Sequence, residues 1–120
     1  MALQFIQKDT FDYPVTVLVP NAKGKHDKQR FTAVFKRLGR KKLAGYVEAI
    51  NGFLPADTEK TDEFLCEVWV GWKDVSGEDG RSIPFNTESR DNLIDIPYVA
   101  TAVSKAYFAA LGGTGSRSGN

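Results

Sequence analysis

The sequence predicts an α+β fold, with an N-terminal antiparallel β-hairpin or three-stranded sheet followed by about four helices and a short β-turn insertion. Two observations predict this fold. β-branched residues and two-residue alternation dominate the first third of the chain, whereas from Arg40 onward apolar residues recur at helical spacing. A chain of 120 residues suits a single domain, which we place at residues 1–111, and the Gly/Ser-rich residues 112–120 are expected to form a flexible tail.

Three strands are predicted in the first third of the chain. Residues 3–7 form a short candidate, and residues 13–19 are rich in β-branched side chains and end before a proline. In the third strand, residues 30–37, the apolar residues Phe31, Ala33 and Phe35 occupy alternate positions. Turn-forming residues between the last two strands, Asn21 to Gly24, predict an antiparallel hairpin with the N-terminal strand alongside it.

Two helices are predicted next. After the strands, apolar residues at i, i+3, i+4 and i+7 predict an amphipathic helix that begins near Arg40 and ends near Gly52. The following apolar run combines strand-like composition with helical spacing, and we assign helix through Trp72 because an acidic first turn precedes one broad apolar stripe. That stripe comprises Phe64, Leu65, Val68, Trp69 and Trp72. Three residues are candidate N-caps for this second helix: Asp57, Thr58 and Thr61.

The last third of the chain is predicted to hold two more helices. A Gly- and Asp-rich turn precedes the third helix, which Asn86 or Thr87 is expected to cap. Pro97 is expected to start a final helix that ends at Gly112, following the preference for proline at helix starts and glycine at helix ends. On the helical wheel Phe108 lies opposite the apolar face, so we expect it to meet either a second layer or a partner.

The two parts of the chain differ in charge. Residues 1–42 carry ten basic and three acidic side chains, a net +7, whereas residues 43–120 carry six basic and twelve acidic ones, a net −6. The overall charge of +1 argues against a strongly basic nucleic-acid binder. Apolar stretches fall far short of the roughly 20 residues of a membrane span, so no membrane partner is expected. With one cysteine and no secretory signal, the simplest compartment is a reducing cytoplasm.

The sequence contains no recognisable catalytic residue, metal-ligand set or cofactor motif, so we predict that the protein is not an enzyme. Cys66 lies in the most apolar run, where burial is expected to quiet its thiol, and His26 lies in a charged turn. One Cys and one His are too few for an ordinary structural zinc site. Residues 74–85 superficially resemble a calcium loop, but Asp79 and Phe85 stand where that loop requires Gly and Glu.

A basic stretch follows the hairpin and has two possible roles. It could bind phosphate groups, with Phe31 and Phe35 beside it to stack bases. We favour a solvated junction between strand and helix, because the total charge is close to zero. The basic surface consists of Lys36, Arg37, Arg40, Lys41 and Lys42.

Trp69 and Trp72 also have two possible roles, as core residues or as anchors for a partner. We favour the core, because two tryptophans at helical spacing are more often core residues.

Several segments resemble the small tail assembly chaperones of long-tailed bacteriophages. They are FTAVFKR at residues 31–37, GWKDV at 71–75, PFNTE at 84–88, LIDIP at 93–97 and AYFAALG at 106–112. The likeness extends from about Leu3 to Gly113 and consists of apolar and turn positions, without a catalytic signature. The chain departs from the family pattern at residues 40–42, where basic residues replace acidic ones.

The resemblance implies a non-enzymatic role in the cytoplasm of the infected host. Such a chaperone would bind the tape measure protein, keep it soluble, guide polymerisation of the tail tube, and be absent from the mature virion. The major tail tube protein and a second copy of the chain are further candidate partners. The residues expected to contact a client or a second copy are four aromatics, Trp72, Phe85, Tyr98 and Phe108.

Two alternative functions remain open. A small structural tail protein, such as a completion or connector subunit, would be present in purified particles. A nucleic-acid-binding module would use the basic surface between Lys23 and Lys42, and its binding would depend steeply on salt. We favour the chaperone, because holding an apolar helical client requires exposed apolar contacts with charged rims rather than a catalytic pocket.

Overall fold

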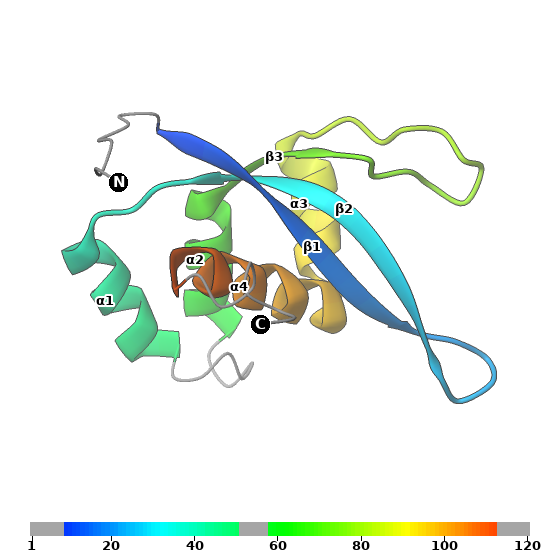
Figure 1. Cartoon of the computed structure of the whole chain (residues 1–120), viewed down its shortest axis with the longest axis horizontal. Helices are drawn as coiled ribbons and strands as arrows, with labels where there is room; N and C mark the ends of the chain where they lie inside the picture. Colours follow the sequence, from blue (N-terminus) through cyan, green and yellow to red (C-terminus); the bar gives the residue numbers. More distant parts are fainter. Residues whose placement is uncertain (1–8, 51–57, 113–120) are drawn as a thin grey trace, which may run out of the picture.

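Three strands and four helices make up the part of the chain that the computed structural model describes, residues 9–50 and 58–112 (Figure 1). This is the predicted α+β fold. The strand expected at residues 3–7, the helix end at Gly52, the cap at Asp57 and the tail from residue 113 lie outside the described residues. In chain order the elements are β1 (Thr10–Pro20), β2 (His26–Lys36), α1 (Arg40–Ile50), α2 (Thr58–Val68), β3 (Trp69–Lys73), α3 (Thr87–Ile94) and α4 (Pro97–Gly112).

β1 and β2 form a long antiparallel hairpin, as predicted. Exposed residues alternate with more buried ones along β1, and half-buried residues alternate with buried ones in the second half of β2, which is the pattern of a sheet with one covered face. In the turn, the Asn21 side-chain oxygen accepts the amides two and four residues further on, at 2.9 and 3.1 Å. Gly24 has a φ of 73°, a conformation that glycine adopts readily. β1 extends beyond both of its predicted limits, whereas β2 begins four residues before its predicted start and ends one residue before its predicted end.

The helix predicted for residues 64–72 is wrong in its second half. α2 ends at Val68 and β3 follows at once, pairing antiparallel with β2 to give the sheet order β1-β2-β3. Strand pairing prevails over the helical spacing because it buries the Trp69 side chain completely. Gly71 permits the close pairing, since a Cβ at this position would lie 3.2 Å from the Val34 Cβ.

An aromatic core joins the sheet to the helices. α4 packs against β1 (Figure 1). The buried Tyr107 ring meets Phe35 edge-on at 5.1 Å and Phe64 at 5.4 Å between ring centroids. The Tyr107 hydroxyl donates to the Lys36 carbonyl oxygen at 2.9 Å, so the polar atom of this buried ring is satisfied. The sheet, α2 and α4 therefore share one core.

α3 and α4 begin where the sequence predicts. The Asn86 side chain accepts the Ser89 amide at 2.8 Å, and the Ser89 hydroxyl accepts the Asn86 amide at 3.1 Å. This reciprocal capping box was not predicted, because serine stands where the usual pattern has Glu or Gln. α4 starts at Pro97 and ends at Gly112, as proline and glycine at these positions predict.

Ser104 is buried on α4, and its hydroxyl has no hydrogen-bond partner among the described residues. Because this hydroxyl loses its water without compensation, Ser104→Ala is expected to raise the free energy of unfolding by about 1 kcal/mol.

Ser89→Ala is expected to have the opposite effect. It removes a hydroxyl that donates to the Pro84 carbonyl at 2.8 Å, and is expected to lower the free energy of unfolding by about 1 kcal/mol. Urea unfolding tests both signs, and a destabilised Ser104→Ala would contradict the prediction.

Candidate functional site

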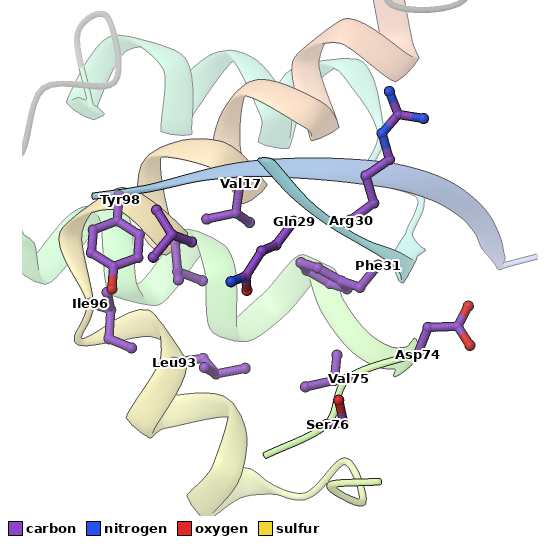
Figure 2. A pocket seen from close by; sticks show the side chains of 12 residues that line it. Val17, Gln29, Arg30, Phe31, Asp74, Val75, Ser76, Leu93, Ile96 and Tyr98 are labelled. Atoms are coloured by element: carbon purple, nitrogen blue, oxygen red, sulfur yellow. The ribbon is translucent and has the colours of Figure 1, made fainter. Parts of the chain in front are cut away.

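An apolar groove of about 300 Å³ lies between the hairpin and the junction of α3 with α4 (Figure 2). β1, β2, the segment after β3 and both C-terminal helices line it. Figure 2 shows Val17, Gln29 and Phe31 on the side of the hairpin that faces α3, with Arg30 on the opposite side. The apolar lining includes Val17, Val19, Phe31, Leu93, Ile96 and Val99.

The groove forms where the chain leaves the sheet after β3. Asp74 has a φ of 65°, a left-handed conformation that ends the pairing with β2. The chain then makes the predicted turn, closed by a bridge between Ser76 and Ser82 and by the Ile83 amide donating to the Val75 carbonyl at 2.8 Å. This arm, residues 75–85, extends away from the helices in Figure 1. Val75 and Ser76 at its start line the groove together with residues of the hairpin.

Trp72 and Phe85, two of the four predicted partner residues, lie together. Their ring centroids are 4.8 Å apart in an edge-to-face arrangement, and the Trp72 indole nitrogen donates to the Ile83 carbonyl at 2.8 Å. Both rings approach the buried Trp69, which contacts Phe31 of the groove at 5.8 Å. The two half-buried rings therefore hold the arm in place and connect it to the groove lining.

Tyr98 and Phe108, the other two predicted partner residues, lie at opposite ends of α4. Tyr98 is 38% exposed and lines the groove. Phe108 is half-buried and stacks on Phe64 with 5.3 Å between centroids, so it meets a second layer. A separation of about ten residues corresponds to roughly 15 Å along a helix. The structure thus brings Tyr98 to the groove and keeps Phe108 apart from it, and the partner role of all four stays a prediction.

All five residues of the predicted basic surface are exposed, at the end of β2 and in the first turn of α1. Two of them have partners: the Arg37 guanidinium lies 5.0 Å from the Phe11 ring centroid, and Lys42 forms an ion pair with Glu67. The proposed base stacking fails at Phe35, because its ring is fully buried. The surface is therefore charged but cannot use the Phe35 ring for stacking, whereas Phe31 is half-buried.

Glu67 connects α2 to α1. Its carboxylate pairs with Lys42 and accepts the Tyr46 hydroxyl at 2.7 Å. The hydrogen bond from Lys42 holds the pKa of Glu67 below its usual value, while partial burial opposes that shift. The hydrogen bond to Glu67, followed by burial, raises the pKa of Tyr46 to about 12. Neutral Tyr46 and ionised Glu67 are thus the forms that stabilise the contact between the two helices.

Tyr46 is expected to make the stability of the protein fall at alkaline pH. Its folded pKa of about 12 exceeds the usual 10, so its contribution is complete below pH 10 and is lost as the pH rises from 10 towards 12. Tyr46→Phe removes this contribution, and the stability difference between the two proteins should shrink over that interval. Urea unfolding on both sides of pH 10 measures it, and a constant difference would contradict the prediction.

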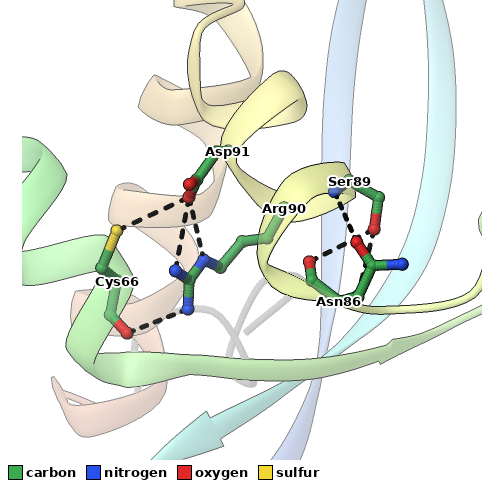
Figure 3. Close-up of polar contacts among 5 residues, drawn as sticks. All are labelled: Cys66, Asn86, Ser89, Arg90 and Asp91. Atoms are coloured by element: carbon green, nitrogen blue, oxygen red, sulfur yellow. Dashed lines mark hydrogen bonds and ion pairs between the residues drawn. The ribbon is translucent and has the colours of Figure 1, made fainter.

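The prediction that Cys66 is a buried thiol is wrong. Cys66 is exposed on α2, since the apolar stripe of this helix turns the flanking residues Leu65 and Phe64 inward instead. Its carbonyl oxygen accepts a hydrogen bond from the Arg90 guanidinium at 3.2 Å, and its thiol donates to the Asp91 carboxylate at 3.8 Å. Figure 3 shows both contacts. Partial desolvation of the sulfur is the largest effect raising the pKa of the thiol, and the positive charge of Arg90 opposes it.

Acidic residues surround a second cavity, of about 270 Å³, next to Cys66. Asp62, Asp91 and Asp95 line it, and burial followed by repulsion from the other two raises the pKa of Asp62. Among the described residues, no group of three or more His, Cys, Asp or Glu is placed to hold a metal ion. The same part of the chain contains no helix with the length and apolar character needed to cross a bilayer.

Comparison of the chain with models of protein families, with curated proteins and with solved structures found no match in any of the three. The candidate site is therefore defined by its geometry: an apolar groove, a neighbouring pair of aromatic rings, and the exposed Tyr98 at the edge. Sequence reasoning singled out Tyr98 as a partner residue and Phe31 only as a possible base-stacking residue, and it assigned no binding role to the other apolar residues of the groove. Those residues read as ordinary core positions, because apolar side chains on strands and helices give no sign that a cavity will separate them.

Proposed function

We propose that this protein is a tail assembly chaperone of a long-tailed bacteriophage. It binds the tape measure protein in the host cytoplasm, keeps it soluble while the tail tube polymerises, and leaves the finished particle. The major tail tube protein is a second proposed client. The proposal begins with the resemblance of segments such as residues 31–37 and 106–112 to that family. The apolar groove is the structural observation that supports it most strongly.

A groove of this kind suits a protein that holds another polypeptide. Unassembled tape measure protein would expose apolar side chains, and these aggregate unless something covers them. The groove offers apolar contacts at Val17, Leu93 and Ile96, while Gln29 and Ser76 provide polar groups within the same lining. An apolar centre with polar groups around it is the usual composition of a protein–protein contact surface.

Co-expression tests the proposed function. The tape measure protein of the same phage is produced alone and together with this protein, and its soluble fraction is measured by sedimentation and gel densitometry. Tape measure protein produced alone is expected to precipitate, and co-expression is expected to raise its soluble fraction severalfold. An unchanged soluble fraction would contradict the chaperone function.

Mass spectrometry of purified phage particles separates the chaperone from a structural tail protein. A chaperone acts during assembly and leaves, so its peptides are expected in the infected-cell lysate and not in density-purified particles. Stoichiometric peptides in the particles would contradict the proposal and would favour a completion or connector subunit instead.

A further inference from the structure

β2 has an edge that β3 leaves uncovered. β2 pairs with β1 along its whole length, but its register with β3 covers only residues 32–35. β3 ends at Lys73, and the left-handed Asp74 carries the chain away. Within the described residues, positions 26–31 of β2 therefore have a strand on one side only. Gln29, Arg30 and Phe31 of this open stretch border the groove, and of these three the Arg30 side chain points away from it.

The backbone groups that face this open edge follow from the hairpin register. The Asn21 amide donates to the Lys25 carbonyl at 2.9 Å, which places the odd-numbered residues of the hairpin in its hydrogen-bonded pairs. Backbone groups alternate in direction along a strand, so those of Lys28 and Arg30 point away from β1. Thr32, the next residue of this set, pairs with Lys73 of β3.

The outer edge of β1 differs in its ability to accept another strand. Its even-numbered residues face outward by the same register, and two of them are Pro14 and Pro20. Proline has no amide hydrogen, and edge prolines are a common protection against unwanted strand pairing. Residues 26–31 contain no proline. Of these two edges, the open stretch of β2 is the one in which no donor is removed by a proline.

Side chains on the two faces of this edge differ in chemistry. Phe31 and Gln29 face the groove together with Val17, so a strand added here would direct every second side chain into an apolar cavity. The intervening side chains would lie on the other face beside the exposed Lys28 and Arg30. Opposite charges across neighbouring strands stabilise the pairing, so acidic residues fit these positions.

Two acidic residues lie near the open edge, one at each end. Asp27 accepts the Asn21 side-chain amide at 3.1 Å at the hairpin tip, and Asp74 lies where β3 departs. Lys28 and Arg30 lie between them, and neither has an ion-pair partner among the described residues. The middle of the edge therefore carries two cations on the face opposite the groove.

We propose that the open edge at Lys28 and Arg30, together with the apolar groove, binds an extended segment of another polypeptide in which apolar and acidic residues alternate. The segment adds to the sheet beyond the end of β3, with main-chain hydrogen bonds to β2 and apolar side chains in the groove. This inference rests on the proposed function, because the client is the polypeptide that supplies the segment.

A synthetic peptide of about eight residues with alternating valine and glutamate tests the inference by NMR. Titration into the full chain is expected to shift the amide signals of residues 28–31 and to slow hydrogen exchange at the Lys28 and Arg30 amides. A peptide of alternating valine and lysine is expected to bind at least about tenfold more weakly, because it repels the two cations. Equal binding of the two peptides, or slowed exchange elsewhere only, would overturn the inference.

Two matched variants locate the edge. Leu18 and Lys28 are cross-strand partners, and their amides face opposite edges of the hairpin. Lys28→Pro removes the donor on the open edge and is expected to abolish peptide binding, whereas Leu18→Pro removes the donor on the outer edge of β1 and is expected to leave binding unchanged. Equal loss of binding in two folded variants would overturn the inference.

A charge reversal decides the question if the proline variants fail to fold. Lys28→Glu combined with Arg30→Glu changes exposed side chains only, and is expected to reverse the preference so that the lysine peptide binds better. An unchanged preference would overturn the inference. The two proposals can also fail separately. If co-expression solubilises the tape measure protein but the glutamate peptide does not bind, strand addition is rejected and the proposed chaperone function stands.

Discussion

Replacing Phe64 with alanine is expected to lower the free energy of unfolding by about 3–5 kcal/mol. Its side chain is fully buried, and its ring lies within 5.3 to 5.4 Å of three other rings, measured between centroids. Those rings come from α1 and α4, so the cavity left by the substitution would loosen contacts of α2 with both helices. The three neighbouring rings are Tyr46, Tyr107 and Phe108.

The loss of stability expected for Phe64→Ala is large relative to the total free energy of unfolding of the domain. A domain of this size is stable by about 5–15 kcal/mol, so Phe64→Ala would remove a substantial part of that margin. Urea unfolding followed by far-ultraviolet circular dichroism measures the change. Phe85→Ala serves as the control, because this ring is half-buried on the arm and its loss is expected to cost about 1–2 kcal/mol. Equal losses in the two variants would contradict the predicted single core around Phe64.

The hairpin and the final helix could be predicted because local patterns and tertiary packing agree there. Alternating apolar residues match the buried face of β1 and β2, and Pro97 and Gly112 mark both ends of α4. The segment around Trp69 could not be assigned in this way. Its side chains satisfy a helical stripe and a strand face equally well, and pairing with β2, distant in sequence, decides between them.

The candidate site was harder to predict than the fold, since five separate parts of the chain line the groove. No single segment carries a motif for it. The one local signal is Asp74, whose left-handed backbone ends β3 and exposes the edge of β2, but an aspartate at this place is compatible with many turns. Cys66 shows the converse error, because its apolar neighbours suggested burial although its own position on α2 faces outward.

Under the proposed chaperone function, Tyr98→Asp is expected to abolish the increase in soluble tape measure protein on co-expression. Tyr98 is 38% exposed at the edge of the groove, and a carboxylate there would lose hydration when an apolar client side chain enters. The variant should remain folded, because an acidic residue in the first turn of α4 interacts favourably with the positive end of the helix dipole. We expect Tyr98→Asp to reduce the affinity for the client at least about tenfold, which corresponds to a loss of roughly 1.4 kcal/mol in binding free energy.

Val70→Asp provides the matched control for Tyr98→Asp. Val70 is 39% exposed, almost the same fraction as Tyr98, but it lies on β3 and does not line the groove. Thermal unfolding of both variants checks that they fold, and co-expression with the tape measure protein then compares their soluble yields. If the groove holds the client, Val70→Asp retains the wild-type yield and Tyr98→Asp falls to the level of tape measure protein produced alone. Equal yields from two folded variants would place client binding on a different surface, because the groove would then tolerate a charge at its edge.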